Sequence, residues 1–396
     1  MPVPGDHRKI VLSGMLALAI AMGIGRFAFT PLLPMMLHDG VVSLAGASWL
    51  ASANYIGYLV GALLCTVRRL PHATRVVRLG LLSTLVLTLA MAVPWGAGWP
   101  FLRFAAGVTS AFVFVYTSEW CLTQAALRGR TSAGALIYTG PGAGIVLTGL
   151  AASAMVAADW KASSGWLVFG LLALLLTVLV WPVFHPRHAL ASPVPPPVRP
   201  AGAAPDHSGT EVAGLAMAYG MAGFGYIVTA TFLPVIARQV LAKSIWLDMF
   251  WPIFGFGVVC GAAIASRIRT ARDLRLMLLG CYLVQALGVA LGLWMPTLPG
   301  FALGSLLVGL PFTAITYFAM QEARRIRPQH IPQTIGLLTA LYGLGQILGP
   351  PLAAFLVSHA GSATTGFEQA LGVAAGALLA GSAVILVLVR RYPVRG

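Results

Sequence analysis

The sequence predicts an all-α integral membrane protein in which twelve transmembrane helices form two six-helix bundles related by pseudo-twofold symmetry. Three observations lead to this prediction. Only 9% of the residues are charged and 58% are hydrophobic, whereas about a quarter of the residues of a soluble chain are charged. The mean hydropathy is +0.87, and the apolar residues collect into twelve runs long enough to cross a bilayer. The third observation is an internal repeat with an offset of 200 residues.

Each apolar run is predicted to form a single helix, because a helix satisfies its own backbone hydrogen bonds in lipid. The approximate limits of the twelve spans are 11–37, 44–67, 76–94, 99–125, 132–158, 163–184, 211–236, 244–266, 276–296, 298–321, 332–358 and 366–389. Prolines inside these runs, such as Pro141, Pro252 and Pro311, are tolerated in membrane helices and often mark kinks.

The repeat relates the first span to the seventh and the second span to the eighth. The matched small residues and prolines are Gly23 with Gly223, Gly25 with Gly225, Pro34 with Pro234, Gly57 with Gly257, and Gly61 with Gly261. We therefore expect an N-terminal bundle of residues 1–184, a Pro-rich cytoplasmic linker of residues 185–210 and a C-terminal bundle of residues 211–396. Two like-oriented halves are the layout of a rocking transporter with a central site.

The basic residues are distributed unevenly between the loops on the two sides of the predicted membrane. Of 25 Lys and Arg residues, 20 lie on the side of the two termini, three lie on the opposite side and two lie inside spans. Cytoplasmic loops are enriched in Lys and Arg, so we expect both termini in the cytoplasm and a multi-pass protein in a plasma membrane like the bacterial inner membrane. Topology thus explains the net charge of +15, and no nucleic-acid partner is expected.

Arg26 is a full charge near the middle of the first span. A cation at that depth costs roughly 2.5 kcal/mol or more unless it faces protein or water. A buried arginine stays charged and binds a carboxylate or phosphate as a fork. We interpret Arg26 as an anion site or an internal partner for a proton-carrying acid, in preference to a structural pair with helix-end carbonyls. Thr30 lies one turn further and is expected to share its face.

Other polar groups near the middle of the spans are expected to complete a substrate site. Amides and hydroxyls can orient a ligand by hydrogen bonds, while tyrosine rings provide apolar contact. These residues are Asn54, Tyr55, Tyr58, Tyr226, Tyr342 and Gln346. Each of them alone could instead form a hydrogen bond between helices.

Glu119 is the one carboxylate placed well inside a predicted span, and it is our candidate for the proton carrier. It follows Arg103 by 16 residues, which places it roughly 160° further around an ideal helix. Both side chains can face one cavity only if the fourth span bends. A glutamate that is satisfied by a neighbouring helix, or that reaches the cytoplasmic interface, remains the alternative.

Several motifs carry a family resemblance. They are Leu102-Arg103 followed by Gly107 and Ala111, Gly140-Pro141 followed by Gly144, GIGRFAFTPLLP at residues 23–34, and NYIGYL at residues 54–59. With the twelve-span layout, they resemble the major facilitator superfamily over essentially the whole chain. The first two are similar to its fourth-span arginine motif and to the fifth-span Gly-Pro motif of its proton antiporters. The last two are similar to its YbfB/YjiJ-type branch.

The resemblance implies roles for several residues. It implies that Arg103 faces the central cavity, although an arginine that snorkels to the outer headgroups is an equal alternative. It also implies that Gly140, Pro141 and Gly144 form a tight contact or hinge between the halves rather than an ordinary kink. The gating residues of the second-to-third-span loop are expected at Arg68 and Arg69. That loop lacks the family's Gly and Asp, and Asp273 is the nearest substitute.

The expected function is secondary active transport by rocker-switch alternating access. The expected substrate is a small anionic or amphipathic organic molecule, moved by proton-coupled export, with proton-coupled uptake of an organic acid as the alternative. We expect protons, the substrate and lipid as partners, a monomer, and no cofactor. The motifs of metalloproteases, phosphate-binding loops and serine hydrolases are absent from the sequence, which disfavours a membrane enzyme. A sensor would normally add a soluble output domain.

Overall fold

The structure is a computed structural model, and it describes residues 6–67, 70–128, 135–184, 209–242, 244–268, 273–328 and 330–393. Arg68 and Arg69, predicted as gating residues, and residues 185–208 of the predicted linker lie outside this part of the chain. The described residues contain twelve helical segments that are long and apolar enough to cross a membrane. The predicted fold class is confirmed, and the chain is a multi-pass membrane protein.

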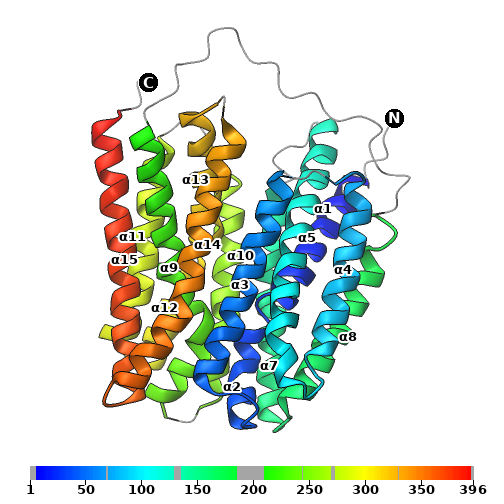
Figure 1. The fold of residues 1–396 in the computed structure, drawn as a ribbon, viewed down its shortest axis with the longest axis vertical. Coiled ribbons are helices and arrows are strands. Elements are labelled where there is room, and N and C mark those ends of the chain that lie inside the picture. Colours follow the sequence, from blue (N-terminus) through cyan, green and yellow to red (C-terminus); the bar gives the residue numbers. More distant parts are fainter. Residues whose placement is uncertain are drawn as a thin grey trace.

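The first six spans form one bundle, drawn in blue to green in Figure 1. The first crossing is built from α1 (Asp6–Leu18), the π-helical segment η1 (Ala19–Ile24) and α2 (Phe29–His38). The next spans are α3 (Leu44–Val67), α4 (Ala73–Ala90), α5 (Trp99–Leu127) preceded by η2 (Gly96–Gly98), η3 (Ala135–Thr139) with α7 (Gly140–Ala157), and α8 (Ala162–Val180).

The last six spans form the second bundle, which stands beside the first (Figure 1). Its helices are α9 (Gly209–Val240), η5 (Ile245–Asp248) with α10 (Phe250–Ala265), α11 (Leu274–Trp294), α12 (Leu298–Gly309) with α13 (Phe312–Ile326), α14 (Ile331–His359) and α15 (Ala363–Arg391). The N-terminal end of α1 and the C-terminal end of α15 lie on the same side of the molecule (Figure 1). We call this side the terminus side.

Two predicted single helices are interrupted. The tenth span is divided into α12 and α13 at Leu310 and Pro311, and the first span is interrupted between η1 and α2, at residues 25–28. Proline lacks a backbone N–H, and its ring clashes with the carbonyl four residues earlier. Pro311 explains the first division directly. Pro31, in the first turn of α2, acts in the same way on Phe27 inside the other interruption.

The Gly-Pro motif lies at the start of α7, where the 3-10 turn η3 becomes an α-helix, so Pro141 begins the helix and does not kink it. A methyl group added at Gly140 would lie 2.2 Å from the Met15 carbonyl oxygen, so Gly140 allows close contact with the first span. A methyl group at Gly144 would likewise lie 2.8 Å from Cα of Gly23. The opposite face of α7 meets the second bundle through Gly142, where a methyl group would lie 2.7 Å from the Gly255 carbonyl oxygen.

This arrangement places α7 between the first span and the other bundle. The glycines of the predicted motif, Gly140 and Gly144, pack against their own bundle, whereas Gly142 and Gly149 are among the residues of α7 that contact the other bundle. A hinge or seal at this helix remains a prediction.

Candidate substrate site between the two bundles

The interruption of the first span places Arg26 outside regular α-helix. The backbone N–H of Gly25 donates to the Ile20 carbonyl at 2.9 Å, and the N–H of Phe27 donates to the Met22 carbonyl at 3.0 Å. Both hydrogen bonds reach back five residues, which is the spacing of a π-bulge, and such bulges occur frequently at functional sites. Arg26 lies between these residues, before α2 begins.

Arg103 of α5 stabilises this interruption. Its Nη1 donates to the Gly25 carbonyl at 3.2 Å and its Nη2 donates to the Arg26 carbonyl at 3.0 Å. Asn54 of α3 donates from Nδ2 to the backbone carbonyl of Arg103 at 2.9 Å. Because the Arg103 side chain is only 2% exposed, it does not snorkel to the headgroups. Its two terminal nitrogens are engaged by backbone carbonyls, and direct substrate contact by Arg103 or Asn54 stays a prediction.

The guanidinium of Arg26 crosses from the first bundle to the second. Its Nη2 donates to Oε1 of Gln346 on α14 at 2.9 Å, and Nε2 of Gln346 donates to the hydroxyl of Tyr226 on α9. Arg26 and Gln346 are 3% and 2% exposed, so these groups are shielded from solvent. Residues 26 and 226, which occupy the same position in the repeat, thus bind one amide. We call these three residues the Arg26 bridge.

Aromatic rings surround the charged end of this bridge. The guanidinium carbon of Arg26 lies 3.9 Å from the centroid of the Tyr58 ring and 5.3 Å from the centroids of Tyr55 and Phe27. These are cation–π distances. Among the residues that the structure describes, no carboxylate forms an ion pair with Arg26, and its Nε has no hydrogen-bond partner. The charge is therefore buried without an anion.

A column of tyrosine rings leads from the Arg26 bridge toward the terminus side. The rings of Tyr226 and Tyr342 are 6.0 Å apart at 22°, and those of Tyr342 and Tyr219 are 4.5 Å apart at 25°. Tyr226 is buried, whereas Tyr342 and Tyr58 are only half-buried. Partial exposure thus begins on the terminus side of Arg26.

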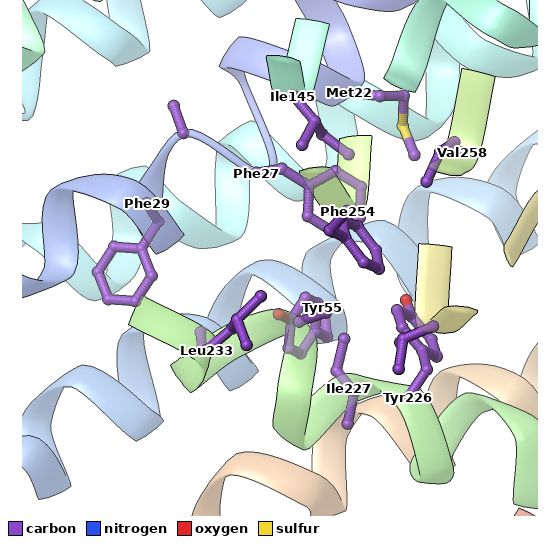
Figure 2. Packing of buried hydrophobic residues seen from close by; sticks show 14 of the residues in the cluster. Met22, Phe27, Phe29, Tyr55, Ile145, Tyr226, Ile227, Leu233, Phe254 and Val258 are labelled. Atoms are coloured by element: carbon purple, nitrogen blue, oxygen red, sulfur yellow. The ribbon is translucent and has the colours of Figure 1, made fainter. Parts of the chain in front are cut away.

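Sequence reasoning missed four aromatic residues of this region: Phe27, Tyr219, Trp251 and Phe312. Phe27 contacts Trp251 at 6.2 Å and Phe312 at 6.0 Å, which continues the ring contacts into α10 and α13. Figure 2 shows Phe27, Tyr55 and Tyr226 among the buried residues of the core. Phe27 could have been suspected because it directly follows Arg26. Trp251 and Phe312 lie in uniformly apolar runs, where nothing distinguishes them from packing residues.

Three further hydrogen bonds join the bundles, from the level of Arg26 toward the side opposite the termini. Thr30 donates to the Ala230 carbonyl at 2.8 Å, Ser52 donates to the Ile347 carbonyl at 2.9 Å, and the hydroxyls of Tyr55 and Thr231 are 3.0 Å apart. Ala230 and Ile347 each precede a proline, Pro234 or Pro351, by four residues, so these carbonyls lack a helical N–H partner. These bonds hold the two bundles together on the side opposite the termini. The Thr30 hydroxyl is engaged by a backbone carbonyl of the second bundle.

The predicted proton carrier and the predicted gating carboxylate lie elsewhere. Glu119 is exposed on α5 and has no part in the Arg26 bridge. Asp273 caps α11 by accepting from the Arg275 backbone N–H at 3.0 Å, and it pairs with the Arg275 guanidinium at 2.9 Å. Burial acts to raise the pKa of Asp273, but the hydrogen bonds and charge of Arg275 outweigh burial and hold this pKa below its ordinary value. The roles of both carboxylates in transport remain predictions.

Comparison with known proteins identifies the family. The family model described as "Uncharacterised MFS-type transporter YbfB" matches residues 18–386. The chain belongs to this family. The predicted resemblance to the major facilitator superfamily and its YbfB-type branch is therefore confirmed.

Solved structures agree with this assignment. A crystal structure of a point mutant of the nucleoside transporter NupG is similar, with a TM-score of 0.71 and 12% sequence identity. The match covers 96% of this chain and 99% of that one. At this identity the likeness shows the fold alone. No curated protein sequence matches the chain. Family and fold together support secondary transport and point to a transporter and not to an enzyme.

Proposed function

We propose that this transporter moves a small organic anion with an apolar or amphipathic body, that it exports this anion from the cytoplasm, and that export is coupled to protons. The observation that carries the proposal is the charge of Arg26. It is buried at the contact between the bundles, and none of the described carboxylates neutralises it. The transporter is proposed to act as a monomer in the plasma membrane.

The electrostatics of the Arg26 bridge favour an anionic substrate. A buried charge without a partner costs several kcal/mol, and a substrate carboxylate would supply the missing countercharge through charge-assisted hydrogen bonds to the guanidinium. Binding would therefore be strongest for anions and weak for neutral molecules of the same shape. NupG is a nucleoside transporter; the unpaired charge of Arg26 favours an anion over a neutral nucleoside here.

Burial also supports alternating access. Because Arg26 is 3% exposed, a substrate can reach its guanidinium only after the bundles move apart. The hydrogen bonds of Thr30, Ser52 and Tyr55 hold the side opposite the termini closed, while Tyr58 and Tyr342 are half-buried. These features favour loading from the terminus side, which the basic loops assign to the cytoplasm. Export follows from this assignment, and uptake of an organic acid would use the same steps in reverse.

Proton coupling is proposed from the Gly-Pro motif, which is similar to that of proton antiporters, and Glu119 is the proposed carrier. Glu119 is exposed and lies close to the terminus-side end of the span Gly96–Ala125, and we expect it to exchange protons at that membrane interface. This position also separates the proton from the anion site, so proton binding would have to act through the movement of α5.

The test is transport by purified protein in liposomes with a pH-sensitive dye inside, for a panel of organic anions and neutral analogues. We expect anion-driven proton flux in the wild type, loss of anion affinity in Arg26→Gln and loss of proton flux in Glu119→Gln. The control is Arg391→Gln, which removes one positive charge from an exposed position at the end of α15. Unchanged anion affinity in Arg26→Gln would exclude the anion site, and unchanged flux in Glu119→Gln would exclude that carrier.

A further inference from the structure

The amide of Gln346 occupies the position at Arg26 that a substrate carboxylate needs. We propose that Gln346 is an internal stand-in for the substrate carboxylate, and that the substrate is a monocarboxylate with a planar aromatic body. This inference rests on the proposed function, in which Arg26 binds the anionic group of the substrate. It adds the chemical class of the substrate and a residue that determines specificity.

The geometry of the Gln346 amide supports its role as a stand-in for the substrate carboxylate. A primary amide and a carboxylate are planar groups of nearly the same shape, and Oε1 of Gln346 accepts from Nη2 of Arg26 at 2.9 Å. The amide holds its other end on the Tyr226 hydroxyl. The arginine charge assists both kinds of bond, but the neutral amide supplies no countercharge, whereas a carboxylate adds Coulombic attraction in this buried site and can accept two guanidinium N–H groups at once. A carboxylate therefore displaces the amide and breaks the Arg26–Gln346 link between the bundles.

The number of available guanidinium groups sets the charge of the ligand. Arg103 lies close to Arg26 in the folded structure, but both of its terminal nitrogens donate to the carbonyls of Gly25 and Arg26. The remaining neighbours of the Arg26 guanidinium are the rings of Tyr55, Tyr58 and Phe27. A second carboxylate on the ligand would lie against these rings with no free terminal guanidinium nitrogen to hydrogen-bond it, which is costly in a buried site. The site thus offers its donors to one carboxylate.

The tyrosine column sets the shape of the ligand. The rings of Tyr226, Tyr342 and Tyr219 are within 25° of parallel from one ring to the next, at 6.0 and 4.5 Å. Aromatic pairs favour offset stacking at such separations. Tyr226 contacts the amide of Gln346 through its hydroxyl, so a ligand whose carboxylate replaces this amide places its body beside the hydroxyl end of the first ring of the column. A flat aromatic body can pack along the column there, whereas a puckered ring cannot stack on these rings.

The experiment measures binding to the purified full chain in lipid nanodiscs by titration calorimetry at neutral pH. The probes are benzoate, 2-naphthoate, cyclohexanecarboxylate, terephthalate, inorganic phosphate and benzamide. We expect the aromatic monocarboxylates to bind at least tenfold more tightly than terephthalate, phosphate or benzamide, and severalfold more tightly than cyclohexanecarboxylate. Gln346→Glu places a permanent internal carboxylate at Arg26 and should weaken the binding of aromatic monocarboxylates at least tenfold. Gln346→Ala removes the amide that competes with the ligand for Arg26, and it should strengthen the binding of aromatic monocarboxylates severalfold.

The matched control is Gln285→Ala, which removes another buried glutamine of the second bundle, one whose Nε2 donates to the Val308 carbonyl at 3.0 Å. It should leave these affinities unchanged. If Gln346→Glu and Gln346→Ala both bind aromatic monocarboxylates as the wild type does, the stand-in role is wrong. If terephthalate or phosphate binds as tightly as benzoate and 2-naphthoate, the substrate class is wrong while the anion site survives. If no anion binds the wild type, the proposed function itself fails.

Discussion

The first and seventh spans occupy the same position in the two halves, yet the first is interrupted and the seventh, α9, is one continuous helix. Both keep the later proline of the repeat, Pro34 or Pro234. They differ at the earlier position, where the first span has Pro31 and the seventh has Thr231. Pro31 is therefore the proline of this region that the continuous span lacks, and both its missing N–H and its ring act on the Phe27 carbonyl inside the break.

The two halves also place their charges at different depths. In the first half Arg26 lies near the middle of the first span and Arg103 lies near the start of α5, and the matched residues of the second half are uncharged: Tyr226 and Leu303. In the second half a charged cluster lies at the terminus side, in which Glu211, Arg275 and Glu322 are buried and Asp273 and Arg325 are partly exposed. Of the matched residues in the first half, Val11, Ala73, Arg75, Leu122 and Ala125, only Arg75 is charged. The first half thus carries its buried positive charge at the contact between the bundles, whereas the second half carries its ion pairs at the helix ends.

The largest effect is expected for Arg103→Leu, which copies the matched residue of the second half. It leaves the buried carbonyls of Gly25 and Arg26 without their donors, and each such loss costs about 1–3 kcal/mol. We expect a loss of stability of about 3 kcal/mol, measured as a lower unfolding temperature in detergent, together with loss of transport. The control is Leu303→Ala, at a matched position that is 47% exposed. Equal stability of the two variants would show that Arg103 does not support the break.

The next effect tests the break itself. Pro31→Thr copies Thr231, restores the N–H and should let the first span continue as a regular helix, which moves Arg26 away from Gln346. We expect transport to fall about tenfold, equivalent to about 1.4 kcal/mol, while the unfolding temperature does not fall. Pro34→Ala, which changes the proline that both halves share, should leave transport within about twofold. Full transport by Pro31→Thr would mean that the interruption has no functional role.

Sequence reasoning predicted the spans, the two bundles and the members of the Arg26 bridge, because a charge or polar group in an apolar run is conspicuous. It could not predict the contacts of Arg103, since these go to backbone carbonyls that become available only when the first span breaks. Thr30 binds the second bundle, as Arg26 does, but its partner is again a carbonyl, that of Ala230, left without a helical N–H partner by a proline on another helix. Backbone acceptors carry no signal in the side-chain pattern, so the sequence alone could not show these contacts.

A smaller effect is expected at the carbonyls that prolines leave free. Ser52→Ala removes the donor to Ile347 and should weaken the contact between bundles by about 1 kcal/mol, which is a roughly fivefold shift toward separation. The readout is the rate at which a membrane-impermeant thiol reagent labels a cysteine introduced at Thr231 or Ala230, compared with the same cysteine in the unsubstituted background. Ser48→Ala is the control, because Ser48 donates to the Leu44 carbonyl of its own helix at 2.8 Å. Equal labelling in both variants would contradict a role for Ser52 in holding the bundles together.

The smallest effect concerns the charged cluster at the terminus side, which the described residues of the first half do not repeat. Because Arg275 holds the pKa of Asp273 below its ordinary value of 3.8, this carboxylate stabilises the folded state above that pH. The contribution of Asp273 to the free energy of unfolding falls as the pH drops through the lowered pKa of the folded state. Below that pKa the carboxyl group is protonated in both the folded and the unfolded protein. Asp273 is partly exposed, so solvent screening limits the effect to about 0.5 kcal/mol. Asp273→Asn should therefore lower the unfolding temperature slightly at neutral pH and match the wild type at the acid end of the titration. A difference that grows as the pH falls would have the wrong sign and would show that Arg275 does not hold Asp273 ionised.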